Sequence, residues 1–203
     1  MIDKITPQQE SEIAVYLKKW LDVGYRTETT DPVKATKFIE FLYKNLLKIE
    51  TPEIHFVKSP LEAQILCNKL VNGIDSGSNQ KLEYFEPSRG NWWLSYYSYG
   101  DYLLNVLFPE KKPEFTLLEE FLENSKHCHF SWTFDTFAIV CDFPDNISIN
   151  SENQLQDNLK AALSYRDGYG VFALDSKTMS KEEWEAKTIQ FKSTLGSEIF
   201  KKI

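Results

Sequence analysis

The chain has 203 residues, of which 42% are hydrophobic and 26% are charged, and its formal net charge is −7 at pH 7. These values are ordinary for a globular domain with a real core, and the negative charge argues against non-specific binding to nucleic acid, whose phosphates it would repel. No stretch approaches the roughly 18 uninterrupted apolar residues of a membrane-spanning helix, so we expect neither nucleic acid nor a membrane as a partner.

The cysteines and the first residues favour a cytoplasmic location. Three cysteines are few and odd in number, which fits a reducing compartment better than a disulfide framework. Cys67, Cys128 and Cys141 all lie in apolar segments, where cysteine usually behaves as a small buried hydrophobe. Residues 1–7 lack the basic and apolar regions of a signal peptide.

The first part of the chain is predicted to be helical, with clear start signals. Residues 6–9 (Thr-Pro-Gln-Gln) combine an N-cap, a proline at the first helical position and the glutamine of a capping box, and Gly24 is a stop signal. Residues 31–32 (Asp-Pro) open a second helix, and residues 59–62 (Ser-Pro-Leu-Glu) open a third. A short strand is expected between them over residues 53–58.

Residues 92–107 are rich in tryptophan, tyrosine and leucine and predict a central, mostly buried helix. Two neighbouring stripes of the helical wheel carry its large side chains, so the apolar arc is wide. One stripe holds Trp92, Tyr96, Tyr99 and Leu103; the other holds Trp93, Tyr97 and Leu104. Asp101 falls on the polar side of the same helix.

The hydrophobic period then changes from helical to strand-like. Residues 127–135 alternate strictly between apolar and polar, which predicts a half-buried strand, and residues 137–143 form a continuous apolar run typical of a buried strand. A further strand is expected over residues 147–150. Residues 180–183 (Ser-Lys-Glu-Glu) are a capping box that opens a C-terminal helix.

Asp167-Gly168 is the strongest turn signal in the chain. Asp-Gly between two alternating apolar runs predicts a β-hairpin with a two-residue turn, because glycine tolerates the positive φ that such a turn needs.

Together these elements predict an α+β fold in a single domain, residues 1–203. A helical part (1–125) packs against a small antiparallel sheet (126–176), and a C-terminal helix (180–200) follows.

The order of these motifs resembles a bacterial domain family of unknown function. Its members share an N-terminal helix ending in Trp-x-x-x-Gly, an acidic-Pro helix start, a Ser-Pro helix start, an aromatic helix and a Tyr-x-Asp-Gly-aromatic hairpin. Here the corresponding segments are residues 20–24, 30–32, 58–61, 93–97 and 165–169. The resemblance extends from about residue 5 to about residue 184 and implies no established activity.

The chain departs from this family around the hairpin. The family typically carries Leu-His and Gly-Pro-Ala just before the turn, where this chain has Leu159-Lys160 and Lys160-Ala161-Ala162. It often carries His-Gly shortly after the turn, where this chain has residues 174–176 (Leu-Asp-Ser). A site built on those histidines in other members is therefore missing here.

His127 and His129 are the best candidates for metal ligands. On a strand, residues i and i+2 point the same way, so both imidazoles could reach one ion, with Asp135 or His55 as a further ligand. The alternative is two histidines on the polar face of an amphipathic strand, which needs no metal. We expect no cofactor.

Four residues are candidates for binding a ligand or a partner. Tyrosine and tryptophan bring polar groups to apolar walls, so Trp93 and Tyr97 could line a pocket with Asp101 beside them. Arg166 at the hairpin could bind an anion or a carboxylate through its guanidinium. Core packing for the aromatic residues, and a solvated turn for Arg166, are the alternatives.

No complete catalytic set is found in the sequence, so an enzyme is not the favoured interpretation. A pairing of Cys128 or Cys141 with a histidine is weak, because both cysteines are expected to be buried and burial blunts thiol reactivity. The sequence favours a non-enzymatic module that binds another protein, since tyrosine and tryptophan are abundant and favoured at interfaces. The alternative is a small-molecule-binding protein or hydrolase with a pocket between the aromatic helix and the sheet.

Overall fold

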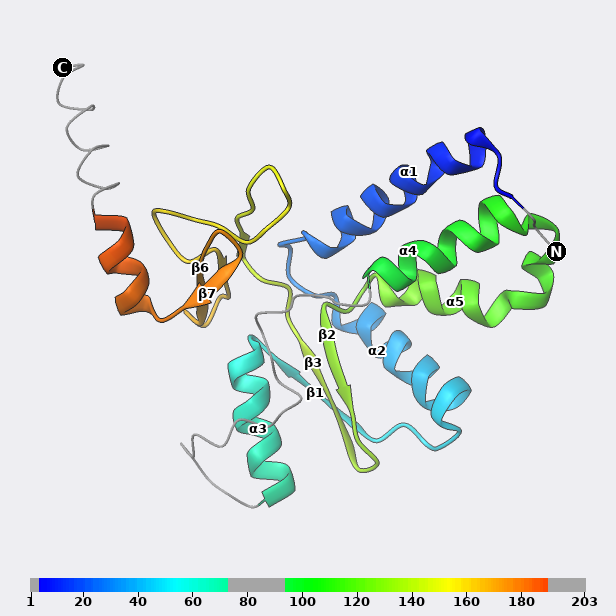
Figure 1. Cartoon of the computed structure of the whole chain (residues 1–203). Helices are drawn as coiled ribbons and strands as arrows, with labels where there is room; N and C mark the ends of the chain where they lie inside the picture. The colour runs from blue at the N-terminus through cyan, green and yellow to red at the C-terminus, as the bar shows by residue number, and fades with distance from the viewer. Residues whose placement is uncertain (1–3, 73–93, 190–203) are drawn as a thin grey trace.

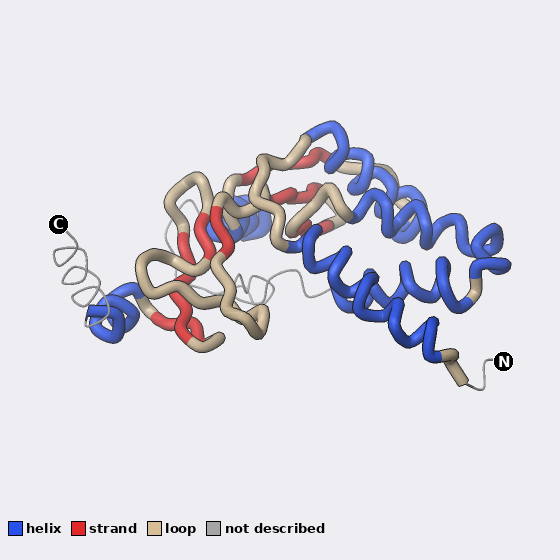
Figure 2. Tube along the Cα trace, turned by 90° about the horizontal axis from the view of Figure 1, so that it is seen from above, coloured by secondary structure: helices blue, strands red, loops and turns tan. Residues whose placement is uncertain are grey.

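The structure, a computed structural model, describes residues 4–72 and 94–189 and confirms the α+β class. Helices dominate the first part of the chain, and most strands and a final helix follow (Figure 1). The strands form a three-stranded sheet in the order β1-β3-β2 and a four-stranded sheet in the order β4-β5-β6-β7. Seen from above, α1 and the C-terminal helix (181–189) lie at opposite ends of the molecule (Figure 2).

Local capping begins the first two helices where the sequence predicts. α1 (Pro7–Gly24) follows Thr6, whose hydroxyl accepts from the Gln9 backbone N–H at 3.2 Å while the Gln9 side chain accepts from the Thr6 N–H at 2.9 Å. α2 (Pro32–Phe41) follows Asp31, whose carboxylate accepts two backbone N–H groups of the first turn. These contacts satisfy amide groups that a helix start otherwise leaves without partners.

The three-stranded sheet joins the two halves of the chain. Its strands are β1 (Glu53–Val57), β2 (Phe130–Thr133) and β3 (Phe137–Cys141). β3 is central, antiparallel to β2 and parallel to β1. The structure therefore adds a parallel strand from the N-terminal half to the antiparallel strands predicted for the C-terminal half.

Helices cover both faces of this sheet. Ala138 and Val140 of β3 are buried in one cluster with α2, and Ile139 and Cys141 are buried in another with α3 (Pro60–Asn72). Successive residues of a strand point to opposite faces, so β3 supplies both apolar layers. The result is a helix–sheet–helix sandwich around one fully buried strand.

Tyr43 connects α2 to the hairpin between β2 and β3. A π-helical segment, η1 (Leu42–Leu47), continues α2 and contains this fully buried tyrosine. The Tyr43 hydroxyl lies 2.6 Å from the carbonyl oxygen of Phe134 and 3.1 Å from that of Phe137. The turn of the hairpin is thereby held against the helical layer.

A second helical layer packs beside α1. It consists of α4 (Leu94–Tyr102), its π-helical extension η3 (Leu103–Leu107), the 3₁₀-helix η4 (Pro109–Phe115) and α5 (Thr116–Ser125). α4 lies between α1 and α5 (Figure 1), with its contacts made chiefly to those two helices.

The aromatic helix is buried on one side only, which corrects the prediction of a mostly buried element. Tyr97 and Leu104 point into the helical layer, whereas Tyr96 and Tyr99 are 63% and 60% exposed. Trp92 and Trp93 lie outside the described residues. One part of the wide apolar arc therefore packs inside the helical layer, and the other part lies on the surface.

The four-stranded sheet is built from short strands. They are β4 (Asn146–Ile147), β5 (Leu163–Ser164), β6 (Gly170–Leu174) and β7 (Lys177–Met179), all antiparallel to their neighbours. Apolar residues of β5 and β6 join the cluster that also contains α3 and β3. The two sheets therefore share one core.

The C-terminal helix begins where the sequence predicts and packs on the four-stranded sheet. The Ser180 hydroxyl accepts from the Glu183 backbone N–H at 3.1 Å. Trp184 packs on Phe172 of β6 with 5.0 Å between ring centroids, and its indole N–H donates to the carbonyl of Asp157 at 2.7 Å.

The Asp167-Gly168 hairpin forms, but its loop has three residues rather than two. The Tyr165 N–H donates to the Tyr169 carbonyl, and the Gly168 N–H donates to the Tyr165 carbonyl, both at 2.9 Å. Within this loop, Gly168 is the residue with a positive φ, 89°, and the Asp167 carboxylate accepts from the Tyr169 N–H. A turn followed by a left-handed glycine gives the flanking strands the same twist as the predicted two-residue turn. The dipeptide Asp-Gly therefore suits both kinds of hairpin loop.

Replacing Gly168 tests this geometry, because a Cβ there would meet no atom within 4 Å and the cost is that of the backbone alone. Gly168→Ala is expected to lower the free energy of unfolding by about 1 kcal/mol, and Gly168→Asn by less, since asparagine tolerates the left-handed region. Urea denaturation measures both. Equal stability of the alanine variant and the wild type would contradict the assigned loop.

Candidate functional site

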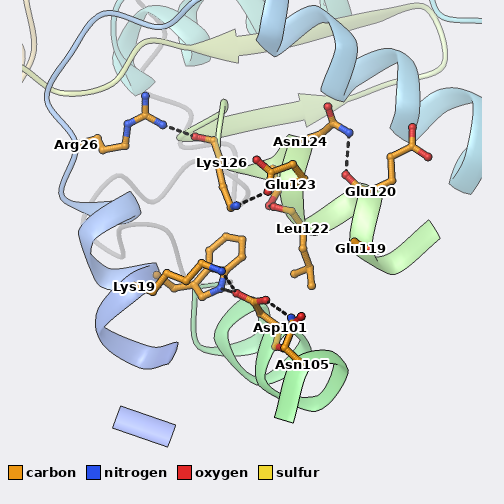
Figure 3. Close-up of polar contacts among 12 residues, drawn as sticks. Lys19, Arg26, Asp101, Asn105, Glu119, Glu120, Leu122, Glu123, Asn124 and Lys126 are labelled. Atoms are coloured by element: carbon orange, nitrogen blue, oxygen red, sulfur yellow. Dashed lines mark hydrogen bonds and ion pairs between the residues drawn. The ribbon is translucent and has the colours of Figure 1, made fainter. Parts of the chain in front are cut away.

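Asp101 of α4 is a buried carboxylate, 6% exposed, with three donors around it (Figure 3). Lys19 Nζ and Trp20 Nε1, both from α1, lie 2.6 Å and 2.9 Å from Oδ2, and Asn105 Nδ2 lies 2.8 Å from Oδ1. The polar side of α4 therefore faces α1. Both carboxylate oxygens accept hydrogen bonds, which offsets the cost of burying the charge.

The Asp101 network continues to α5 through Lys112 of η4. Lys112 Nζ donates to Asn105 Oδ1 at 3.1 Å and lies 2.7 Å from Glu119 Oε1. Hydrogen bonding to Glu119 raises the pKa of Lys112. Side chains of opposite charge thus alternate from α1 across α4 to α5.

Tyr97 packs against the same network from its apolar side. Its ring meets those of Trp20 and Phe121 edge-on, with centroids 5.3 Å and 5.4 Å apart. Burial raises the pKa of the Tyr97 hydroxyl to about 12, so it stays protonated at neutral pH. Trp93, the other aromatic candidate, lies outside the described residues.

Arg166 reaches out of the hairpin and joins two distant segments. Its Nη1 lies 3.0 Å from Asp142 Oδ2 and 2.8 Å from the Phe143 carbonyl oxygen, and Nη2 lies 2.5 Å from the Thr27 carbonyl oxygen. The planar guanidinium offers several donors in fixed directions, which suits three acceptors at once. The hairpin is thereby fastened to the loop between α1 and α2.

Asp142, which follows β3, anchors that same loop with its second oxygen. Oδ1 accepts from the backbone N–H of Thr30 at 2.6 Å and of Phe143 at 2.9 Å. Arg26 stacks its guanidinium 5.0 Å above the Phe143 ring and donates to the Lys126 carbonyl at 2.8 Å. Both arginines of this junction therefore have partners within the chain.

His129 is buried in the apolar part of this junction. Its ring centroid lies 4.4 Å from that of Phe130 and 5.5 Å from that of Phe143, and its Nδ1 has no hydrogen-bond partner. Burial lowers the pKa of His129 to about 4, so the imidazole is neutral at physiological pH. His127 is only half-buried, and burial followed by the charges of Lys34 and Arg26 lowers its pKa.

The two histidines do not share the strand face that the metal prediction assumed. β2 begins at Phe130, so His127 and His129 precede it, and the i, i+2 argument for a strand does not apply to them. Across residues 4–72 and 94–189, no three His, Cys, Asp or Glu side chains are grouped to hold one ion. A metal at this pair stays a prediction, without a third described ligand.

The cysteines have the environment of structural thiols. Cys67, Cys128 and Cys141 are buried and unpaired. Burial raises the pKa of all three, that of Cys128 to about 12. A nucleophilic thiolate is therefore disfavoured at neutral pH.

The candidate residues fall into two groups rather than one pocket. Tyr97 and Asp101 belong to the interface between α1, α4 and α5, whereas Arg166 and His129 lie around Phe143 at the junction with the second sheet. Within the described part of the chain, no hydrogen bond joins the two groups. In each group, basic side chains and other donors surround one carboxylate. The first group fixes α1 to α4, and the second fixes the hairpin to the loop between α1 and α2.

Sequence reasoning missed the partners that give these residues their roles. Lys19, Asn105 and Asp142 carry no local motif. Trp20 belongs to the Trp-x-x-x-Gly motif, but it lies 81 positions from Asp101, and the motif does not indicate that partner. The sequence placed Asp101 on the polar side of the aromatic helix, but it did not indicate that this carboxylate is buried. Comparisons with models of protein families, with curated proteins and with solved structures found no match.

Removing the Asp101 carboxylate is expected to destabilise the helical layer. Asp101→Ala leaves the buried Trp20 N–H without an acceptor, which should lower the free energy of unfolding by about 2–3 kcal/mol. Urea denaturation followed by tryptophan fluorescence measures the loss. Asp22→Ala is the control, because its exposed pair with Lys18 should contribute under about 0.5 kcal/mol; similar losses in both variants would contradict the network.

His129 makes stability depend on pH. Its pKa is about 4 in the folded state, against about 6.5 when unfolded, so the unfolded chain takes up the proton first as the pH falls. The contribution of the neutral imidazole to the free energy of unfolding is complete above about pH 6.5 and declines towards pH 4. Roughly 2 kcal/mol of that free energy is lost at pH 5. Urea midpoints of the wild type and of His129→Leu at pH 7 and pH 5 test this.

The Leu variant should lose less stability between these pH values than the wild type. His127→Gln, two positions away, should retain most of the wild-type pH dependence, because that side chain is half-exposed. A His129→Leu variant with the full wild-type loss at pH 5 would refute the assignment.

Proposed function

We propose that the protein is a non-enzymatic module that binds another protein through the outer face of α4. The observation that carries this proposal is the exposure of Tyr96 and Tyr99, which lie three positions apart and so on one side of the helix. Tyrosine offers a large, rigid contact with a polar tip and is enriched where proteins meet. The opposite side of α4 is occupied by the Asp101 network.

Exposed apolar residues of α1 support a contact of this kind. Ile13 and Leu17 lie one turn apart on α1, the helix packed beside α4, and they are 44% and 42% exposed. The net charge of −7 favours a neutral or basic partner surface. The partner therefore presents apolar or basic groups to this pair of helices.

The setting that we propose is the cytoplasm of a bacterium, within the domain family that the motif order resembles. No helix in the described ranges is both long and apolar enough to cross a bilayer. Three unpaired cysteines accord with a reducing compartment. The alternative, a small-molecule-binding protein or hydrolase, is less favoured, because Tyr97, Asp101 and Arg166 are each engaged by internal contacts.

A paired variant tests the proposed surface. Tyr96→Asp/Tyr99→Asp should abolish stoichiometric recovery of a partner from host extract at low salt, because each change places a charge where an apolar contact is expected. Leu159→Asp/Ile189→Asp alters two equally exposed residues elsewhere and should leave recovery intact. Circular dichroism checks that both variants fold.

A partner that binds the wild type and both paired variants equally would refute this surface. A partner lost only with the tyrosine pair would support it. Failure of the wild type to retain any stoichiometric protein across growth conditions would oppose the interaction module itself.

A further inference from the structure

The outer edge of β1 carries backbone groups that no described strand uses. β1 lies at one edge of the sheet (Figure 1), and the carbonyl of Val57 accepts from the Asp142 N–H, so Val57 turns its backbone groups towards β3. Alternate residues of a strand hydrogen-bond to opposite sides. The N–H and C=O groups of Ile54 and Phe56 therefore point outward from the sheet.

The two residues whose backbone groups point outward from this edge both have apolar side chains. Ile54 and Phe56 share the face covered by α2, and Phe56 is 43% exposed although it adjoins the buried Val140. Natural edge strands are usually protected by an outward charge, a proline or a bulge at the open positions. β1 has Pro52 and Glu53 at its start, but neither open position carries such protection.

We propose that β1 pairs with β1 of a second copy of this chain, antiparallel, around a two-fold axis at His55. In that register Ile54 lies opposite the partner's Phe56, and each such pair exchanges two backbone hydrogen bonds. The open groups are symmetric about His55, so the edge is complementary to itself, as a two-fold interface requires. The two sheets become one six-stranded sheet.

The other face of β1, on the α3 side, carries Glu53 and His55 together with the buried Val57. His55 meets the partner's His55 in a pair without backbone hydrogen bonds, where Cα atoms lie about 4.5 Å apart. Glu53 Oε1 lies 3.8 Å from His55 Nδ1 in the same chain. Each copy therefore brings a carboxylate beside the histidine pair. The edge of β1 is a different surface from the outer face of α4, and pairing there does not require a partner at α4.

The first test is self-association. The contact consists of four hydrogen bonds and a small apolar area, so we expect a dimer with a dissociation constant of roughly 10–100 μM in sedimentation equilibrium. Phe56→Lys should raise this constant at least tenfold. Phe115→Lys changes an equally exposed phenylalanine beside α5 and should leave it unchanged. A wild type that stays monomeric at several hundred micromolar would overturn the proposal.

The second test fixes the register. Two cysteines at position 55 would face each other at a distance suited to a disulfide, so His55→Cys should form a covalent dimer under mild oxidation. Glu53→Cys is the matched control on the same strand face, because its two copies would lie about 13 Å apart along the strands. The native cysteines are buried and give a low background. Equal cross-linking of both variants, or cross-linking only through position 53, would refute the register.

Discussion

The burial of β3 on every side is the constraint on which the rest of the structure depends. All five of its residues are buried, so each face needs an apolar helix and each edge needs a strand. α2 and α3 supply the faces, and β1 and β2 supply the edges. Because those elements come from both halves of the chain, neither half can complete this core alone. The same strand ends at Asp142, where the polar contacts of the junction begin.

Two carboxylates then determine how neighbouring elements are oriented, which the apolar core alone does not do. Apolar packing has little directional preference, so it does not by itself set how α1 lies on α4 or how the hairpin meets the first sheet. Asp101 sets the first contact through donors on α1, and Asp142 sets the second through Arg166 and Thr30. Each carboxylate has donors on both oxygens, which offsets the cost of enclosing a polar group.

The local features of the fold could be predicted from the sequence, whereas the long-range ones could not. Caps at Thr6, Asp31 and Ser180 act within one helical turn, so their residue types alone indicate them. The hairpin was predicted correctly, but its predicted two-residue loop was wrong, since Asp167-Gly168 suits both a two-residue and a three-residue loop. The exposed side of α4 and the partners of Asp101 depend on which helices pack nearby, and the helical period does not contain that information.

The separation along the chain of the contacts around Thr30 and Asp142 has a consequence for synthesis on the ribosome. These residues are 112 positions apart, and β1 pairs with a strand that is made more than 80 residues later. The loop after α1 and the edge of β1 must therefore wait, without their final partners, until that later strand has left the exit tunnel. Chains with such non-local pairings fold slowly and expose apolar surface meanwhile. The apolar residues of β1 are thus exposed for longer during synthesis than those of a strand whose partner is local.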